Sequence, residues 1–288
     1  MRIETKNLVY SYESGKKDSS SVALNGVSLT INEGEFFGII GQTGSGKSTF
    51  VQHLNGLIKL QKGCGEITIG EYNLSQDYNA KELRSKIGMV FQYPEYQLFA
   101  ETVKEDVAFG LKNFHPNLAD NEVEERVREA ISLVGLDYEK IKDRSPFELS
   151  GGQKRRVAIA GVIVSKPEVL VLDEPAAGLD PKGKKEFLQL LKKLHQTFVK
   201  TVVLVSHDMN IISGYCTRAG VFSKGKLIAV GTPKEIFADK SAMENSGLSL
   251  PTTAYIQSAL KDRGINIDSD LTADDFISKI LREFRGDK

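Results

Sequence analysis

Apolar and polar positions alternate over the first stretches of the chain and then give way to short, purely apolar runs. Alternation, as in residues 2–12, indicates strands with one buried face, whereas a short apolar run such as residues 168–175 indicates a strand buried on both faces. A strand buried on both faces is typical of a parallel sheet. The expected strands are residues 2–12, 22–31, 35–41, 65–70, 86–92, 168–175 and 201–207.

Helical spacing of apolar residues separates several of these strands. Asp180 and Pro181 provide an N-cap and a first-turn proline for one helix, and Gly135 provides a stop for another. Strands that alternate with helices on this scale predict an α/β fold with a mostly parallel central sheet. The apolar positions are Phe50, Leu54 and Leu57 in one helix, Val123, Val127, Ile131 and Val134 in a second, and Phe187, Leu188, Leu191 and Leu194 in a third.

The pattern changes near residue 238. Residues 238–251 show no periodicity and are expected to form a linker, and helical patterns follow at residues 251–263 and 272–285. In the second pattern Thr272 is a candidate cap. The chain is therefore expected to divide into residues 1–237 and a small C-terminal helical extension, residues 238–288. The expected apolar face of the last helix consists of Phe276, Ile277, Ile280 and Phe284.

Composition narrows the functional classes. The 288 residues contain 38 Lys and Arg against 38 Asp and Glu, and a neutral chain lacks the positive field that bulk nucleic-acid binding requires, so no nucleic-acid partner is expected. Cys64 and Cys216 have no metal-binding spacing, which indicates thiols in a reducing compartment. No apolar run approaches the roughly 18–20 residues of a membrane helix, and the start has no signal-peptide pattern. These features favour a soluble protein on the cytosolic side, which leaves room for a membrane partner.

Residues 41–48 read GQTGSGKS and fit the pattern G-x-x-x-x-G-K-[ST] between a buried strand and a helix. Glycines allow backbone N–H groups to surround a phosphate, and the start of the helix adds its positive dipole. Lys47 would contact the β- and γ-phosphates, and the hydroxyl of Ser48 would bind Mg²⁺. The stretch therefore predicts a nucleoside triphosphate site.

Polar residues at the ends of three other strands complete this prediction. Asp173 ends a buried strand where its carboxylate can hold the Mg²⁺ shell, and Glu174, turned differently by strand pleating, can polarise an attacking water. His207 could contact the γ-phosphate, and the amide of Gln92 suits Mg²⁺ or water. Alone, the Asp-Glu pair would be a helix cap or a turn, His207 a structural histidine and Gln92 a loop amide; behind a phosphate loop the functional interpretation is favoured.

Residues 150–153 read SGGQ and stand directly before a predicted helix. A hydroxyl, bare N–H groups and a helix dipole make this N-terminus ready for an anion. It has no lysine of the phosphate-loop kind, so it is interpreted as a lid for a γ-phosphate held by a second copy or a close relative. Two chains would then face each other head to tail and enclose two nucleotides.

With residues 149–153, LSGGQ, the motif set is similar to that of ATP-binding-cassette ATPases over about residues 1–237. The resemblance implies a P-loop NTPase core, an N-terminal antiparallel β subdomain, an inserted α-helical subdomain, and ATP and Mg²⁺ as cofactors. It also implies that Tyr12 stacks on adenine and that Asp180 lies in a loop crossing the dimer interface. The implied nucleotide-binding residues are Tyr12, Gly41, Gln42, Thr43, Gly44, Ser45, Gly46, Lys47, Ser48, Thr49, Ser150, Gly151, Gly152, Gln153 and Asp180; Glu174, His207 and Gln92 are catalytic, and Ser48, Gln92 and Asp173 hold the metal.

Residues 91–110, residues 145–161 and the C-terminal extension are similar to the ATPases of energy-coupling-factor importers of vitamins and transition metals. Residues 41–57 and 146–153 look more like the second of that family's two ATPase types, and the departures at Gln42 and Ala176 do not touch the chemistry. The resemblance implies a peripheral protein on the cytoplasmic face of the cell membrane. Its partners would be a second cassette (identical or related), a transmembrane coupling subunit and a small substrate-binding membrane subunit that selects the cargo.

Two surfaces are expected to serve these partners. Tyr93, Pro94, Leu98 and Phe99 are expected to line a groove for a short helix of the membrane partner. Leu260, Phe276, Ile280 and Phe284 are expected to help hold two cassettes together.

The sequence disfavours three alternative classes of protein. Another class of cassette transporter is disfavoured by residues 93–99, YPEYQLF. Chromosome and DNA-repair ATPases need a long coiled coil between the nucleotide motifs, for which this chain has no room, and translation-associated proteins carry two cassettes in one chain.

Overall fold

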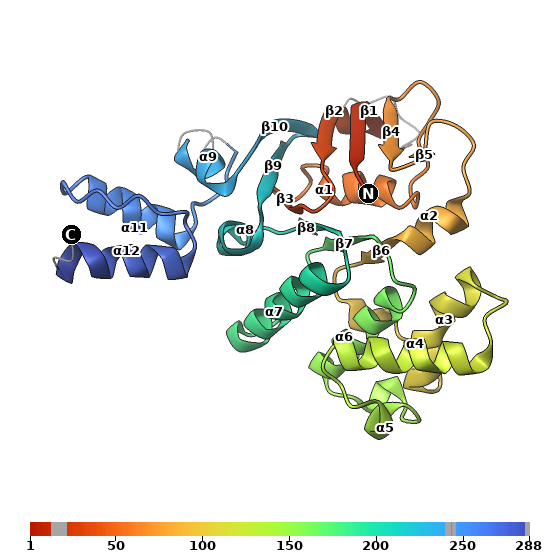
Figure 1. Ribbon diagram of the computed structural model, residues 1–288. Coiled ribbons are helices and arrows are strands. Elements are labelled where there is room, and N and C mark those ends of the chain that lie inside the picture. Colours follow the sequence, from red (N-terminus) through yellow and green to blue (C-terminus); the bar gives the residue numbers. More distant parts are fainter. Residues whose placement is uncertain (13–21, 240–242, 244–245, 286–288) are drawn as a thin grey trace.

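The computed structural model describes residues 1–12, 22–239, 243 and 246–285 (Figure 1). Within these residues the chain forms two β-sheets, a block of helices below the larger sheet in this view, and a pair of C-terminal helices on the opposite side. No helix in the described part of the chain combines the length and the hydropathy that a membrane span requires.

The N-terminal sheet is antiparallel, with the strand order β2-β1-β4-β5. Ile3 lies opposite Ile31 on one side and Ile69 on the other, and all three side chains are fully buried. The predicted alternation therefore identified the buried face correctly. The strands are β1 (Ile3–Ser11), β2 (Val22–Ile31), β4 (Glu66–Ile69) and β5 (Tyr72–Asn73).

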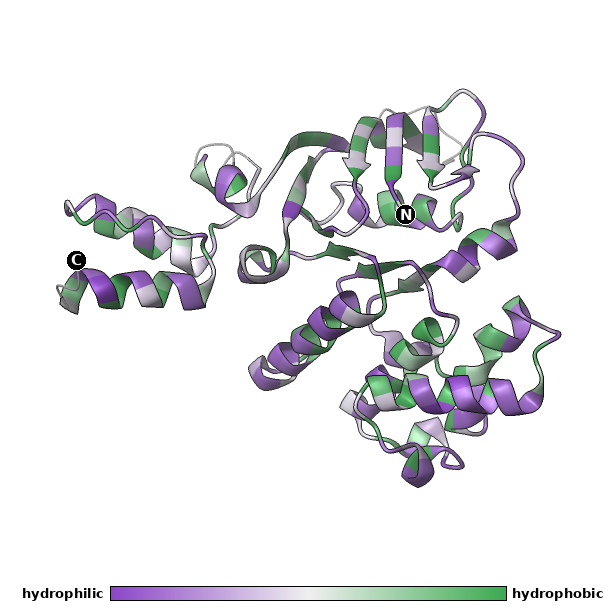
Figure 2. Cartoon of the chain, viewed as in Figure 1, coloured by the Kyte–Doolittle hydropathy of each residue, from purple (hydrophilic) through white to green (hydrophobic). Residues whose placement is uncertain are grey.

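The central sheet has six strands in the order β10-β9-β3-β8-β7-β6. All neighbours from β9 to β6 are parallel, and β10 is antiparallel to β9. The predicted apolar runs form its buried strands, which are green at the centre of Figure 2. The segments that follow the parallel strands meet at one edge, where α/β proteins bind ligands. The strands are β3 (Phe36–Gly41), β6 (Ile87–Val90), β7 (Val169–Asp173), β8 (Thr201–Val205), β9 (Arg218–Ser223) and β10 (Lys226–Gly231).

A helical block is inserted between β6 and β7, as the family resemblance implied (Figure 1). In α4 the side chains of Val123, Val127 and Ile131 are buried in the main core, so the predicted stripe is confirmed. The block contains η2 (Pro94–Gln97), α3 (Val103–Phe114), α4 (Asp120–Leu133), α5 (Tyr138–Ile141), η3 (Pro146–Glu148) and α6 (Gly151–Ile163).

The remaining helices of the cassette pack around the central sheet. The helix after residue 46 was expected to include Leu57, but α1 ends at Leu54 and Leu57 is 50% exposed, because Gly56 adopts a φ of 67° that an α-helix does not contain. The start of α7 is as predicted, since the Asp180 side chain accepts a hydrogen bond from the N–H of Gly183. These helices are α1 (Lys47–Leu54), α2 (Ala80–Lys86), α7 (Pro181–Thr197), α8 (Met209–Tyr215) and α9 (Pro233–Ala238).

The expected linker, residues 238–251, includes residues 240–242 and 244–245, which lie outside the described part of the chain. Three of its described residues pack against the cassette: Met243 is 2% exposed in the main core cluster, and Leu248 and Leu250 pack against that cluster. This part of the segment therefore attaches to the cassette. The few apolar residues of this segment follow neither a helical nor a strand period by which the burial of Met243 could be predicted.

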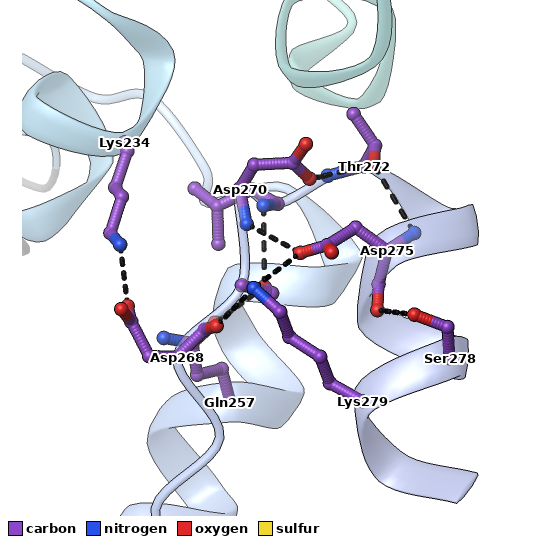
Figure 3. A network of polar contacts seen from close by, with 10 residues as sticks. Lys234, Gln257, Asp268, Asp270, Thr272, Asp275, Ser278 and Lys279 are labelled. Atoms are coloured by element: carbon purple, nitrogen blue, oxygen red, sulfur yellow. Dashed lines mark hydrogen bonds and ion pairs between the residues drawn. The ribbon is translucent and has the colours of Figure 1, made fainter. Parts of the chain in front are cut away.

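The C-terminal helices, α11 (Thr252–Lys261) and α12 (Ala273–Arg285), are joined by a polar network (Figure 3). Asp268 pairs with Lys234 of α9, and its backbone carbonyl accepts a hydrogen bond from Lys279 of α12. Thr272 caps α12, because its hydroxyl accepts a hydrogen bond of 3.3 Å from the N–H of Asp275.

The predicted apolar face of α12 is split. Phe276 is 4% exposed, whereas Ile277 and Phe284 are 54% and 65% exposed, and Leu281, which was not in the predicted face, is 44% exposed. The helix therefore packs through Phe276 and presents a second apolar strip on its surface. In Figure 2, α12 carries green segments among purple ones.

Candidate nucleotide site

The loop between β3 and α1, residues 41–48, can be built only with glycine at two of its positions. A Cβ on Gly41 would lie 2.3 Å from the carbonyl oxygen of Phe222, and a Cβ on Gly46 would lie 2.4 Å from that of Ala23. Gly46 is also the N-cap of α1, with a φ of 100°. A glycine cap has no side chain that could occupy the first N–H groups of α1, so these donors remain available to an anion.

The ammonium group of Lys47 is buried against the backbone of this loop. Its Nζ donates hydrogen bonds of 2.8 Å and 2.9 Å to the carbonyl oxygens of Gly41 and Gln42, and the residue is only 8% exposed. Burial lowers the pKa of Lys47, and the carboxylates of Glu174 and Asp173 oppose that shift. A second buried group of the loop, the Ser45 hydroxyl, has no hydrogen-bond partner in the structure. The loop thus presents the Lys47 cation to one cleft, which Ser48 and Thr49 also line, whereas the buried Ser45 is not among the described residues that line it.

Asp173, the last residue of β7, has the features of a cation ligand. It is 8% exposed, and its Oδ1 has no hydrogen-bond partner in the structure. Burial raises its pKa, while a hydrogen bond from Ser48 and the charge of Lys47 oppose the shift. A carboxylate oxygen without a partner beside a hydroxyl is a donor set that Mg²⁺ accepts, with nucleotide phosphates and water as further ligands. These residues therefore fit a nucleotide-bound Mg²⁺.

Glu174 lies one residue beyond β7. The sequence predicted that strand pleating turns its side chain, and this explanation is wrong: Glu174 adopts a φ of 49°, in the left-handed region, and its N–H bonds to the carbonyl of Val205. Its Oε2 lies 2.8 Å from Nδ1 of His207. As predicted, His207 therefore lies beside the end of the strand that leads to Glu174. The positive φ of Glu174 is itself informative, because non-glycine residues held in this conformation are often found at functional sites.

One cleft of about 720 Å³ gathers most of the predicted residues. Tyr12 lies at its edge, where its hydroxyl is 3.0 Å from the Thr49 hydroxyl and its ring packs edge-on against Tyr10. Sequence reasoning missed Val22 and Ala23, which begin β2 and also line the cleft. The available signal was the predicted strand start at Val22, which follows the strand that leads to Tyr12. The lining residues are Tyr12, Val22, Ala23, Thr43, Gly44, Gly46, Lys47, Ser48, Thr49, Gln92, Asp173, Glu174 and His207.

The second anion-ready stretch does not line this cleft. Ser150 is the N-cap of α6, where its Oγ accepts from the N–H of Gln153 and the Gln153 side chain accepts from the N–H of Ser150. Gly151 and Gly152 are exposed, and a Cβ added at either would meet nothing within 4 Å. Asp180 is likewise absent from the described residues that line the cleft. The chain therefore carries two separate polar half-sites.

The turn after Gln92 differs from expectation. Pro94 is buried and Leu98 is 6% exposed within the main core, so neither lines a surface groove. Phe99 is 58% exposed and packs edge-on against Phe109, which is 52% exposed, with ring centroids 4.8 Å apart. The carboxylate of Asp106 accepts hydrogen bonds from the N–H groups of Phe99 and Ala100 and so fixes this turn.

A mostly parallel sheet with a phosphate loop, an acidic strand end and an inserted helical block defines an ATP-binding cassette. Residues 24–177 match the family model described as ABC transporter. The structure superimposes on that of cbiO1 from Clostridium perfringens, described as part of the ABC transporter complex cbiONQ, with a TM-score of 0.72, 38% identity and coverage of 89% of this chain and 98% of that one. A dimeric structure of the cassette MJ0796 bound to ADP and Pi gives a TM-score of 0.70 at 32% identity, covering 80% of this chain and 98% of that one.

Two curated relatives define the type more closely. The energy-coupling factor transporter ATP-binding protein EcfA2 of Clostridium tetani is 47% identical over 272 residues, which is 94% of this chain and 93% of the relative. The protein of the same name from Clostridioides difficile is 46% identical over 289 residues, which is 99% of each chain. The chain belongs to the energy-coupling factor transporter ATP-binding proteins of the ABC family and is an ATPase of that type.

Proposed function

We propose that this ATPase powers a membrane importer of vitamins or transition-metal ions as one of a pair of cassettes. The observation that carries the proposal is the separation of two half-sites on one chain, the phosphate cleft and the bare glycines at the start of α6. A γ-phosphate in the cleft needs donors from a second cassette, either a copy of this chain or a related one. Closure of the pair on ATP would then move the membrane subunits.

Within such a pair each residue of this chain has a defined task. Lys47 and the N–H groups of residues 41–48 bind the phosphates, Thr49 flanks them, and Tyr12 stacks on adenine. Ser48, Asp173 and Gln92 hold Mg²⁺, which when bound neutralises charge on the phosphates. From the opposite chain, Ser150 and the N–H groups of Gly151 and Gly152 approach the γ-phosphate, and Gln153 and Asp180 lie at the interface.

Glu174 acts as the general base in this proposal. Its carboxylate orients the attacking water and takes up its proton, and His207 holds that carboxylate through the 2.8 Å hydrogen bond. Because the bond joins the segments that follow β7 and β8, it fixes the base relative to the end of β8, and β8 pairs with β3, the strand that leads into the phosphate loop. The partner's glycine N-terminus would exclude bulk water on the other side of the phosphate.

We further propose that residues 1–237 form the nucleotide-binding domain and residues 238–288 a dimerisation extension. The support is the exposed strip Ile277, Leu281 and Phe284 on α12. The proposed membrane partners are a transmembrane coupling subunit and a small substrate-binding subunit, which hold the chain at the cytoplasmic face. The exposed pair Phe99 and Phe109, fixed by Asp106, suits the apolar side of a docking helix of the coupling subunit.

Isolation of the complex tests this function. The full chain with an affinity tag is purified from its native membrane, the co-purifying integral proteins are identified, and ATP-dependent uptake is measured after reconstitution into vesicles. We expect a large coupling subunit, a small binding subunit, and uptake that stops when Glu174→Gln replaces the native chain. A preparation without any integral subunit, or uptake that persists with Glu174→Gln, would refute the proposal.

A further inference from the structure

Arg155 on α6 is a buried cation with an unusually full set of partners. It is 4% exposed, although it lies only four residues from Gly151, the first residue of its helix. Its Nε and Nη2 donate hydrogen bonds of 2.9 Å and 2.8 Å to the two carboxylate oxygens of Glu95. Its Nη1 donates to the backbone carbonyls of Pro175 and Ala177, at 3.2 Å and 3.1 Å.

These partners belong to two segments of the nucleotide site. Glu95 lies in η2, three residues after Gln92, and the intervening Tyr93 has a left-handed φ of 55°. Pro175 and Ala177 lie between Glu174 and Asp180. A single guanidinium therefore ties the helix that carries residues 150–153 to the turn of Gln92 and to the loop that leads from the base to the interface.

The geometry of these contacts demands arginine. A planar guanidinium satisfies both oxygens of a carboxylate at once and fixes their relative orientation, whereas an ammonium acts as a point charge. Burial is the largest single influence and raises the pKa of Glu95, but the hydrogen bonds and charge of Arg155, together with a backbone hydrogen bond, outweigh it, and the pKa lies below its usual value. Because separating a buried arginine from its carboxylate is costly, these contacts oppose independent movement of the three segments.

We propose that Arg155 is a positioning residue that keeps Gln92 and Glu174 in register with the glycine N-terminus of α6. The inference rests on the proposed two-chain site, because Gln92 and Glu174 serve the nucleotide of their own chain and α6 serves that of the partner. Through Arg155, a displacement caused by the γ-phosphate at Gln92 reaches the half-site that the same chain offers to its partner. The role is positional, since the guanidinium contacts protein groups rather than substrate.

An ordinary structural ion pair is the competing explanation, and the chain contains a suitable comparison. Arg218 donates a hydrogen bond of 2.8 Å to Glu35, and both side chains are partly buried. Glu35 immediately precedes β3 and Arg218 begins β9, so this pair lies at the amino edge of the sheet, opposite the nucleotide site. The change Arg218→Lys is therefore a matched control for Arg155→Lys.

The test compares Arg155→Lys, Glu95→Gln, the double variant and Arg218→Lys in the complex purified from the membrane. Thermal melting, kcat and KM for ATP are measured for each. Misplacement of catalytic groups by about 1 Å can cost about 10²-fold in rate, so we expect Arg155→Lys to lower kcat at least about tenfold with KM changed less than about threefold. If the pair acts as a unit, the double variant should be no slower than the slower single variant, and Arg218→Lys should retain native turnover.

Three outcomes would overturn the inference: native kcat in Arg155→Lys, a KM that rises as kcat falls, or additive losses in the double variant. An equal loss of kcat in Arg218→Lys would likewise reduce Arg155 to a structural role. A native complex that hydrolyses no ATP would instead contradict the proposed function, and that result is seen before any variant is made.

Discussion

The change Glu174→Gln tests whether residue 174 must accept a proton, because it removes the carboxylate charge and keeps the shape of the cleft. The amide has nearly the shape of the carboxylate, and its oxygen can still accept a hydrogen bond from Nδ1 of His207 across the same 2.8 Å. The hydrogen bond from the Glu174 N–H to the Val205 carbonyl is unaffected, because it belongs to the backbone. The substitution should therefore preserve the cleft and remove only the ability to accept a proton.

The size of the effect follows from that loss. General-base assistance contributes about 10²–10⁴ in rate, so kcat should fall at least about 10²-fold, which corresponds to about 2.7 kcal/mol of barrier. Nucleotide affinity should change by less than about threefold, since Lys47 keeps its two carbonyl partners. Burial lowers the pKa of Lys47 in the native chain, and the carboxylates of Glu174 and Asp173 oppose that shift. Removal of the Glu174 charge therefore lowers the pKa of Lys47 further, while Asp173 continues to oppose the shift.

Phosphate release under saturating ATP measures the rate, and titration with a fluorescent ATP analogue measures binding. Glu168→Gln is the matched control, because Glu168 immediately precedes the other end of β7 and pairs only with surface lysines, Lys86 and Lys200, among its described ion pairs. Glu168→Gln should hydrolyse ATP at the native rate. If Glu174→Gln keeps more than about a tenth of native turnover, Glu174 is not the base.

Three other predictions concern assembly and coupling. Leu98→Asp should unfold the chain or lower its stability by about 3 kcal/mol or more, since Leu98 is 6% exposed. Phe99→Asp should retain the native melting temperature and ATPase activity but abolish uptake in vesicles. Ile228→Asp, at an exposed position on β10, is the neutral control. Loss of folding in Phe99→Asp would contradict the docking role. Lys47→Ala and Ser150→Arg should each be inactive, and mixing them should restore part of the ATPase activity; inactivity despite cross-linked mixed pairs would contradict the shared site. Ile277→Lys with Leu281→Lys should weaken association of nucleotide-free chains in sedimentation, and an unchanged profile would show that the α12 strip does not hold the pair.

The central sheet and the phosphate loop were accessible from sequence for a simple physical reason. A parallel strand is buried on both faces, so runs such as residues 169–173 are continuously apolar, and a loop that surrounds phosphate needs glycine where Gly41 and Gly46 touch backbone carbonyls. The place of Glu174 in the cleft was predicted from its position at a strand end. The orientation of its side chain was not predicted, because the left-handed backbone of Glu174 depends on β8, to whose residue Val205 the Glu174 N–H donates a hydrogen bond.

The errors arose where neighbouring residues look alike. Leu98 and Phe99 are both apolar and adjacent, yet one is in the core and the other on the surface, since the Asp106 carboxylate and the packing of α3 decide which way the turn faces. Met243 lies in a segment whose few apolar residues follow neither a helical nor a strand period, so the local sequence did not indicate its burial. Val22 begins β2 at the predicted residue, but it lies beside the cleft because it pairs with Ser11, next to Tyr12, and the sequence pattern does not reveal which strands pair.

The cap at the start of α6 has an energetic consequence. The side chains of Ser150 and Gln153 each accept a hydrogen bond from the backbone N–H of the other, so this N-terminus is already ordered in the single chain, while Gly151 and Gly152 are exposed. In the proposed pair, the conformational entropy of ordering that surface would thus be lost when the chain folds rather than when two chains close on ATP. More of the free energy of nucleotide binding then remains available as mechanical work on whatever the pair is attached to.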